Sequence, residues 1–166
     1  MLNEEQIVQD LESWMKDFVE KPNPLLNNWA PCPYARQARI TDKIEIVFSE
    51  PVQLIATVEK NLSLLDDKDI VIICFDHTKI SVEEVEELVR ITNREILMAR
   101  DYVILEDHPD EPESLNGVKM NFGKCGLLLV QQLSKLSTAS DQLKEKGYYD
   151  DWPEENYLDV VAWRPQ

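Results

Sequence analysis

The spacing of apolar residues predicts four long helices. Over about residues 4–20, an apolar side chain recurs every three or four positions, which is the spacing of an amphipathic helix. Asn3 can cap this helix, with Gln6 placed to reach back to it, and the two prolines of "KPNPLL" end it. The same spacing predicts helices over about 49–65, 82–99 and 124–146. Ser81, with Glu84 three positions later, predicts a capping box at the start of the helix over 82–99.

Three shorter apolar stretches predict strands. "KIEIVFSE" alternates apolar and polar positions, "DIVIICF" is a continuous apolar run typical of a strand covered on both faces, and "YVILED" is the third. Strands that alternate with helices through short connections favour parallel pairing. We therefore expect an α/β fold, a small layered domain with a three- to four-stranded, mostly parallel sheet flanked by helices. A ferredoxin-like α+β arrangement is the alternative.

The length of 166 residues predicts a single domain over 1–166. The acidic C-terminal segment 148–166 fits both a helix and a strand, and it is a candidate appendage to that domain. A long acidic loop over about 107–122 follows the third strand, and a loop of that length is often functional or mobile.

Charge narrows the classes of partner. The chain has 17 basic and 32 acidic residues and a net charge of −15. A field of this sign repels nucleic acid and anionic membranes, so neither direct nucleic-acid binding nor membrane binding is expected. It favours a small molecule, a basic protein partner or a metal ion, and it also fits a nucleic-acid mimic.

The amino-terminal stretch "MLNEEQIVQD" carries neither the basic region nor the apolar run of a targeting segment, and no stretch reaches the length of a transmembrane helix. The three cysteines are an odd number without a signal peptide, which indicates free thiols in a reducing compartment. These features predict a cytoplasmic protein.

Both histidines of the chain follow an aspartate just past a predicted strand. They are Asp76–His77 in "FDHT" and Asp107–His108 in "EDHP". Open α/β sheets bind ligands beyond the carboxyl ends of their strands, so parallel neighbouring strands would bring both pairs to one edge. The imidazoles could then act as acid, base or metal ligand, with the carboxylates orienting them. The alternative is two surface histidines beside capping aspartates.

Cys32 is a second candidate, as a nucleophile or a ligand. It precedes Pro33, which predicts the start of a short helix over about 33–39. A helix start and the nearby Arg36 and Arg39 would lower the pKa of the thiol. Arg36, Arg39 and Trp29, together with Asn121, could bind a ligand. The alternative is a small apolar side chain packed under Trp29.

Metal binding is a third possibility, with zinc or iron as the cofactor. Its ligands would be His77, His108, Cys32 and Cys125, which are residue types that both metals accept. Their spacing is scattered, and no CxxC or HxxxH pattern accompanies them. Cys74 lies in the middle of the second predicted strand and is expected in the core.

Several short motifs together resemble a family of uncharacterised small bacterial proteins. The family has "CPFA" after an amino-terminal helix with a tryptophan, then "FHP" after a strand, then an asparagine before a leucine-rich helix. The matching pieces here are Trp14, "CPYA", "DHP" and "NFGKCGLLLVQQL". Phenylalanine of the family is replaced by Tyr34 and Asp107. The resemblance brings no reaction, and it implies only that Cys32, His108 and Asn121 line a common site.

Two functions follow as hypotheses. In the first, a thiol and histidine site of Cys32, His77 and His108 binds a metal or performs acid–base or nucleophilic catalysis on a small or cationic substrate. In the second, the chain is a non-catalytic acidic accessory or interaction protein, or a nucleic-acid mimic. Whether the protein is an enzyme is left open by the sequence.

Overall fold

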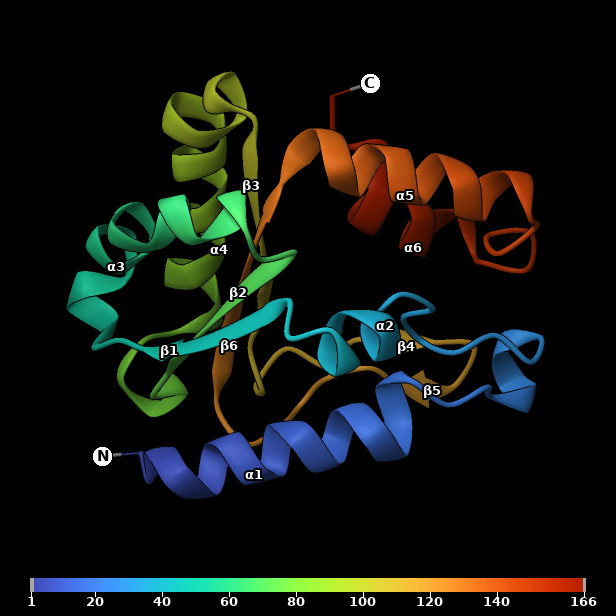
Figure 1. The fold of residues 1–166 in the computed structure, drawn as a ribbon, viewed down its shortest axis with the longest axis horizontal. Coiled ribbons are helices and arrows are strands. Elements are labelled where there is room, and N and C mark those ends of the chain that lie inside the picture. The colour runs from blue at the N-terminus through green and yellow to red at the C-terminus, as the bar shows by residue number, and fades with distance from the viewer. Residues whose placement is uncertain (1, 166) are drawn as a thin grey trace.

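A computed structural model describes residues 2–165. A four-stranded sheet forms its centre, in the order β1 (Ile44–Phe48), β2 (Ile70–Phe75), β6 (Gly126–Gln132) and β3 (Tyr102–Asp107). Helices cover the sheet, as Figure 1 shows, and the expected α/β class is confirmed at this level. The sheet is mixed, because β1 and β2 pair in parallel while β6 runs antiparallel to both of its neighbours.

The expectation of a mostly parallel sheet is therefore not met, and β6 is the reason. The sequence predicted a single helix over 124–146, whereas the chain forms β6 first and only then helix α5 (Leu133–Glu145). The run "GLLLV" fills the central gap of the sheet, where both faces are covered. Gly126 lets β6 approach β2, since a Cβ at this position would overlap the ring of Phe75.

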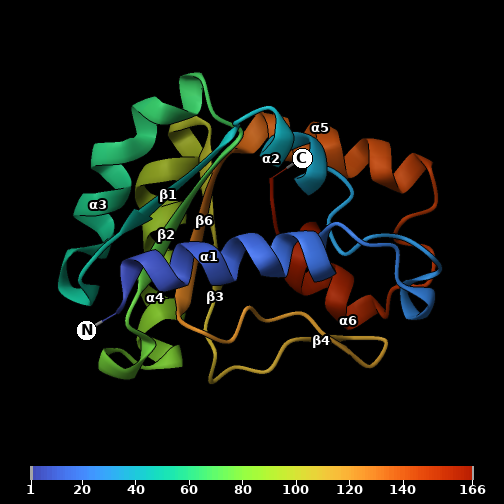
Figure 2. The same cartoon turned by 60° about the horizontal axis from the view of Figure 1, so that its bottom comes forward.

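Helices α3 (Leu54–Asn61) and α4 (Val82–Thr92) cover one face of the sheet, and α1 (Glu4–Trp14) covers the other. Alternate residues of β2 divide between these two layers, as expected for a strand. Val71, Ile73 and Phe75 pack toward α3 and α4, while Ile72 and Cys74 pack toward α1. Figure 2 shows α1 crossing in front of the strands.

The ends of the predicted helices are irregular. A π-helical turn, Met15–Val19, extends α1, and α4 continues through Asn93–Leu97 and a 3₁₀ turn, Met98–Arg100. Two 3₁₀ turns flank α3, at Pro51–Gln53 and Leu62–Asp66. Asn3 caps α1 as predicted, since it accepts the Gln6 N–H at 3.1 Å, but the Gln6 side chain donates to Asp10 at 2.9 Å instead of reaching back. Ser81 and Glu84 form a full capping box at the start of α4.

Beyond the amino ends of β1 and β2, a second group of elements extends from the sheet, on the right of Figure 1. It contains α2 (Ala35–Ile40), α5, and α6 (Glu154–Tyr157) with its continuation Leu158–Ala162. The long acidic loop carries a small hairpin of β4 (Ser114–Leu115) and β5 (Val118–Lys119). Among residues 2–165, no helix combines the length and the apolar character needed to cross a membrane.

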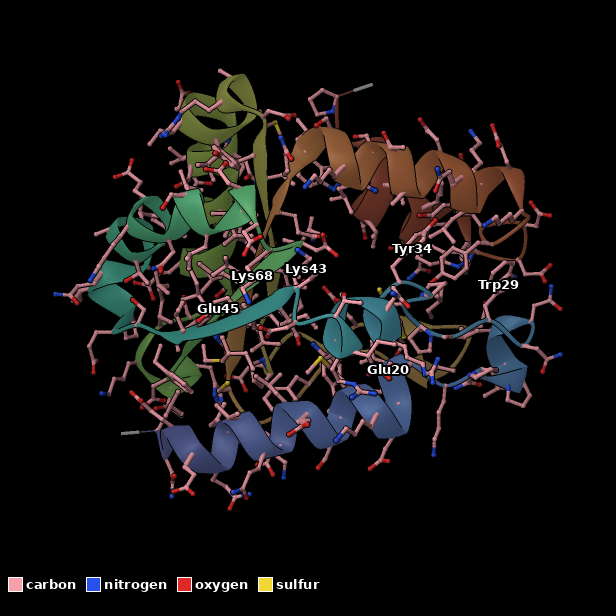
Figure 3. The ribbon with its side chains drawn as sticks, in the orientation of Figure 1. Glu20, Trp29, Tyr34, Lys43, Glu45 and Lys68 are labelled. Atoms are coloured by element: carbon pink, nitrogen blue, oxygen red, sulfur yellow. The ribbon has the colours of Figure 1, made fainter. Side chains whose placement is uncertain are left out.

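The C-terminal segment, described to residue 165, is helical and packs onto the rest of the chain. The Tyr148 hydroxyl donates to the Pro31 carbonyl at 2.6 Å, and the Trp29 ring meets Tyr148 edge-on at 5.4 Å. Tyr148 also contacts Tyr149 and Trp152, so an aromatic cluster joins residues 148–157 to the loop before α2. Figure 3 shows Trp29 and Tyr34 on this side of the molecule.

Candidate functional site

The two Asp–His pairs lie at the same edge of the sheet. β2 and β3 both run antiparallel to the intervening β6, so they share a direction and their carboxyl ends lie at the same edge, one strand apart. The rings of His77 and His108 are perpendicular, with centroids 5.7 Å apart. The structure thus brings the two histidines together, across the strand that the sequence analysis did not foresee.

His108 has no ring nitrogen left for a ligand. It is only 3% exposed, its Nε2 lies 2.9 Å from the Ile80 carbonyl oxygen, and its Nδ1 accepts the Asp110 N–H at 3.1 Å. Because Nδ1 accepts, Nε2 carries the proton and donates to Ile80. The imidazole therefore braces two backbone segments, and metal binding or proton transfer at either nitrogen would require the hydrogen bond of that nitrogen to break.

The polar side-chain groups of Asp107 and Asn121 are also engaged in hydrogen bonds within the protein. Asp107 accepts from the Asn121 amide at 2.7 Å and from the Phe122 N–H at 2.9 Å, while burial raises the pKa of its carboxyl. Asn121 also donates to the Glu111 carbonyl at 2.9 Å and accepts the Glu113 N–H at 2.7 Å. These hydrogen bonds hold the loop between β3 and β6 in its conformation. They occupy the polar groups of Asp107 and Asn121.

The first pair is different in its surroundings. Asp76 caps the turn His77–Lys79, accepting from the Thr78 hydroxyl at 2.6 Å and the Thr78 N–H at 3.1 Å. The hydrogen bond from the Thr78 hydroxyl lowers the pKa of Asp76, so this carboxylate is ionised. His77 is half-buried, and its Nδ1 is buried without a hydrogen-bond partner among the described residues.

Cys32 lies at the other end of the sheet. The helix that follows it, α2, leads through residues 41–43 into the amino end of β1, and Tyr34 reaches α5, which begins where β6 ends. The histidines follow the carboxyl ends of β2 and β3, so the structure does not bring Cys32 to them. A site shared by Cys32, His77 and His108 is not assembled.

The expected lowering of the Cys32 pKa is also wrong. Cys32 is reached by solvent, yet the protein around its sulfur desolvates the thiolate and raises the pKa of the thiol, and the Glu20 carboxylate adds to this. The backbone N–H groups of Tyr34 and Ala35 oppose the shift with a smaller effect. The helix α2 begins only at Ala35 and has six residues, so it offers little dipole.

The two arginines near Cys32 interact with the Glu20 carboxylate. Arg39 binds both carboxylate oxygens of Glu20, at 2.7 and 2.9 Å, and this ion pair joins α2 to the end of the first helix. Arg36 is exposed, and its charge helps to lower the pKa of Glu20. Figure 3 shows Glu20 beneath α2, on the side toward α1. Arg39 thus has a structural role, while ligand binding by Arg36 and Arg39 stays a prediction.

Of the four predicted zinc or iron ligands, the structure brings only His77 and His108 close together. Cys125 is fully buried before β6, in the same apolar cluster as Cys74, and a hydrogen bond between the two thiols raises the pKa of Cys74. Within residues 2–165, no three or more histidine, cysteine, aspartate or glutamate side chains are grouped as metal ligands would be. The structure therefore does not group His77, His108, Cys32 and Cys125 around one point.

The structure reveals a cavity that the sequence analysis missed. It has a volume of about 260 Å³ and lies beyond the carboxyl ends of β1 and β2. We call it the rim pocket, and its lining residues are Leu2, Glu4, Phe48, Ser49, Glu50, Gln53, Thr57, Cys74, Asp76 and Lys79. The signal was present in "FSEP", since polar residues directly follow β1 just as Asp76 follows β2.

Three carboxylates and one ammonium group line the rim pocket. Lys79 Nζ lies 3.6 Å from Glu50 Oε2 and 3.9 Å from Asp76 Oδ2, so it bridges the ends of the two strands. Ser49 Oγ and Thr57 Oγ1 are 2.7 Å apart and supply two hydroxyls. The pocket therefore carries a net negative charge, with hydrogen-bonding groups beside the apolar side chains of Leu2 and Phe48.

No family model, curated protein or solved structure matches the chain. The resemblance built on "CPYA" and "DHP" therefore stays a prediction, and the site has to be argued from its own geometry. That geometry separates three places: a closed network at Asp107, His108 and Asn121, a thiol at the far end of the sheet, and the rim pocket.

Proposed function

We propose that this protein binds a small organic cation in the rim pocket. The observation that carries the proposal is the position of the pocket, beyond the carboxyl ends of the one parallel strand pair in the sheet. Ligands of open α/β sheets bind at this position because the loops that follow parallel strands converge there. The expected preference of an acidic chain for small cationic molecules supports the same class of ligand.

Charge and shape support an amine in particular. Glu50 and Asp76 already hold the ammonium group of Lys79 between them, and Glu4 adds a third carboxylate from the first turn of α1. A ligand ammonium can join the same carboxylates, while Ser49 and Thr57 offer hydroxyl oxygens as acceptors. Leu2 and Phe48 suit a short aliphatic chain.

We favour binding over catalysis at this pocket. Its one thiol, Cys74, is kept protonated by its hydrogen bond with Cys125 and by burial, which together raise its pKa. Neither histidine is among the residues that line the pocket, and His108 has both ring nitrogens engaged. All three cysteines are free thiols, which supports the prediction of a reducing, cytoplasmic compartment.

Isothermal titration calorimetry tests the proposal with 1,4-diaminobutane as probe, and with butane-1,4-diol and succinate as neutral and anionic counterparts. We expect saturable binding of the diamine alone. Losing one charged hydrogen bond in Glu50→Gln or Asp76→Asn should weaken binding by roughly ten- to a hundredfold. Glu59→Gln makes the same charge change on α3, outside the pocket lining, and should leave binding unchanged. Equal losses in all three variants would reduce the effect to net charge and refute a specific site.

A second candidate function is docking of a basic protein partner. Carboxylates gather where α4, β3 and the acidic loop meet: a hydrogen bond with Glu86 and burial raise the pKa of Glu111 to about 7, and Glu106 adds repulsion. A cationic partner would relieve this crowding. A lysine-rich peptide should bind with strong salt dependence and lose affinity in the double variant Glu86→Gln/Glu111→Gln. Binding that ignores both salt and this variant would exclude the surface.

A further inference from the structure

A second cavity lies between α5 and the C-terminal helical segment. It has a volume of about 140 Å³ and is lined by Ser137, Ser140, Asp141, Lys144, Tyr157, Val161, Ala162 and Arg164. The first four of these residues follow the spacing of one face of α5, which is polar although it faces a packed neighbour. Helices that pack on each other normally present apolar residues to each other. Packing therefore does not explain why this face of α5 is polar.

Arg164 is the unusual group in this cavity. It is only 5% exposed, and its Nη2 donates to Ser140 Oγ at 2.9 Å. Its Nε and Nη1 are buried with no hydrogen-bond partner among the described residues. Burial lowers the pKa of Arg164, which reflects the cost of holding this charge away from water. Unused donors on a buried cation are rare in folded proteins, because each costs the free energy of its lost hydration.

The remaining lining groups suit an anion. Lys144 adds a second positive charge and lies with its Nζ 5.8 Å from the centroid of the Tyr157 ring. Ser137 and Ser140 provide hydroxyls, and Asp141 is the one carboxylate in the lining. Two cations against one carboxylate make the cavity locally positive in a chain whose net charge is −15. The volume equals about four to five water molecules, enough for a carboxylate or phosphate group.

We propose that this cavity binds a small oxyanion, a carboxylate or phosphate group, through Arg164, Lys144, Ser137 and Ser140. The anion would accept the unused Nε–H and Nη1–H of Arg164 and lie beside the ammonium group of Lys144. Binding would tie α5 to the segment that contains Val161 and Arg164. The site is separate from the rim pocket and does not depend on the ligand proposed there.

Thermal unfolding of the full chain tests the proposal, with inorganic phosphate and acetate as probes at an ionic strength kept constant with sodium chloride. We expect a saturable rise in Tm of about 5 °C or more at a hundredfold excess over Kd. The probe that produces the rise identifies the class of anion. A rise that keeps growing linearly with phosphate would be the general effect of an excluded salt and would overturn the proposal.

Variants make the test specific. Lys144→Gln should raise Kd about tenfold, and Arg164→Gln should abolish the shift. Lys135→Gln changes the same charge on the same helix, outside the cavity lining, and should behave as the wild type. If Arg164→Gln fails to fold, the anion-induced shift in Tm is compared between Lys144→Gln, Ser137→Ala and the control Lys135→Gln. Only the first two should lose affinity. No shift with either anion, or equal losses in Lys144→Gln and Lys135→Gln, would overturn the site.

Discussion

The two Asp–His pairs are identical in sequence and differ in what the fold does with them. Asp107 and His108 are buried, and the Asp107 oxygens and both ring nitrogens of His108 are engaged by neighbouring groups. Asp76 caps a short turn and lines the rim pocket beside His77, which keeps a nitrogen without a hydrogen-bond partner among residues 2–165. Residue type and position after a strand therefore do not define a ligand site. A side chain can contribute to such a site only where its hydrogen-bonding groups are not already engaged by the protein.

The length of the following connection explains the difference. After β3, the chain must cross residues 108–125 before it returns as β6, and the buried backbone of that loop needs polar partners. Asp107, His108 and Asn121 supply them. After β2, only a 3₁₀ turn separates the strand from α4, so a single cap at Asp76 suffices. Other polar groups at the carboxyl ends of β1 and β2 are therefore left to line the rim pocket.

The largest effect should come from Asn121→Ala. The change removes the amide that joins Asp107, Glu111 and Glu113, and it leaves the buried Asp107 carboxylate with the Phe122 N–H but without its side-chain partner. We expect a loss of about 2–4 kcal/mol in the free energy of unfolding, measured in urea. Asn156→Ala is the matched control: its partly exposed amide donates to the Ser114 carbonyl at 3.0 Å from a helical position that suits alanine, and its loss should stay below about 1 kcal/mol. Similar losses in the two variants would contradict a bracing role for Asn121.

A comparison of the histidines should give the next largest effect. His108→Phe keeps the ring but leaves the Ile80 carbonyl and the Asp110 N–H without their partner. We expect a loss of about 1–3 kcal/mol. His77→Phe removes a nitrogen that makes no hydrogen bond in the described structure and should cost less than about 1 kcal/mol. Equal destabilisation by urea unfolding would show that the two pairs have the same role.

The two regions should also respond to pH in opposite directions. Neighbouring carboxylates and desolvation raise the pKa of Glu111 and Glu113 to about 7, so the folded protein binds these protons more tightly than the unfolded chain. Their contribution to stability is complete below about pH 4.5 and is lost as pH rises through about 7. The pKa of Asp76 is lowered, so its contribution is present above about pH 4 and is lost as pH falls further.

We therefore expect Glu111→Gln to gain stability relative to the wild type between pH 5 and pH 8, by less than about 1 kcal/mol because solvent screens the group. Urea unfolding at pH 5, 6.5 and 8 measures the difference. Glu83→Gln, an exposed glutamate of α4 with the same charge change, should keep the wild-type slope. If the free energy of unfolding of Glu111→Gln changed with pH in parallel with that of the wild type, Glu111 would not contribute to the pH dependence.

The smallest effect concerns Cys32, at the far end of the sheet. Only this thiol is exposed, so native protein should react with one equivalent of a disulfide reagent, and unfolded protein with three. Because its pKa is raised, Cys32 should react more slowly than free cysteine at pH 8. Cys32→Ser should change the free energy of unfolding by no more than about 0.5 kcal/mol. Reaction faster than free cysteine would restore Cys32 as a candidate nucleophile.

Local signals account for what could be predicted. The apolar spacing of "EEQIVQDLESW" and "VEEVEELVRIT", with their caps at Asn3 and Ser81, predicted α1 and α4 because these patterns act within a few residues. The runs that became β1, β2 and β3 were recognised for the same reason. The prediction of a helix over "GLLLV" is wrong, since a short apolar run fits a helix or a strand and only its neighbours in the fold decide between them.

The sequence by itself determined most of the secondary structure, the excess of negative charge and the position of both Asp–His pairs after strands. The tertiary structure decided that β6 enters the sheet, that the histidines meet across it and that Cys32 lies at the opposite end. It also decided which polar groups are engaged and which line the two cavities. These outcomes depend on contacts between residues far apart in the chain, such as Asp107 with Asn121 and Ser140 with Arg164, and no local pattern encodes such contacts.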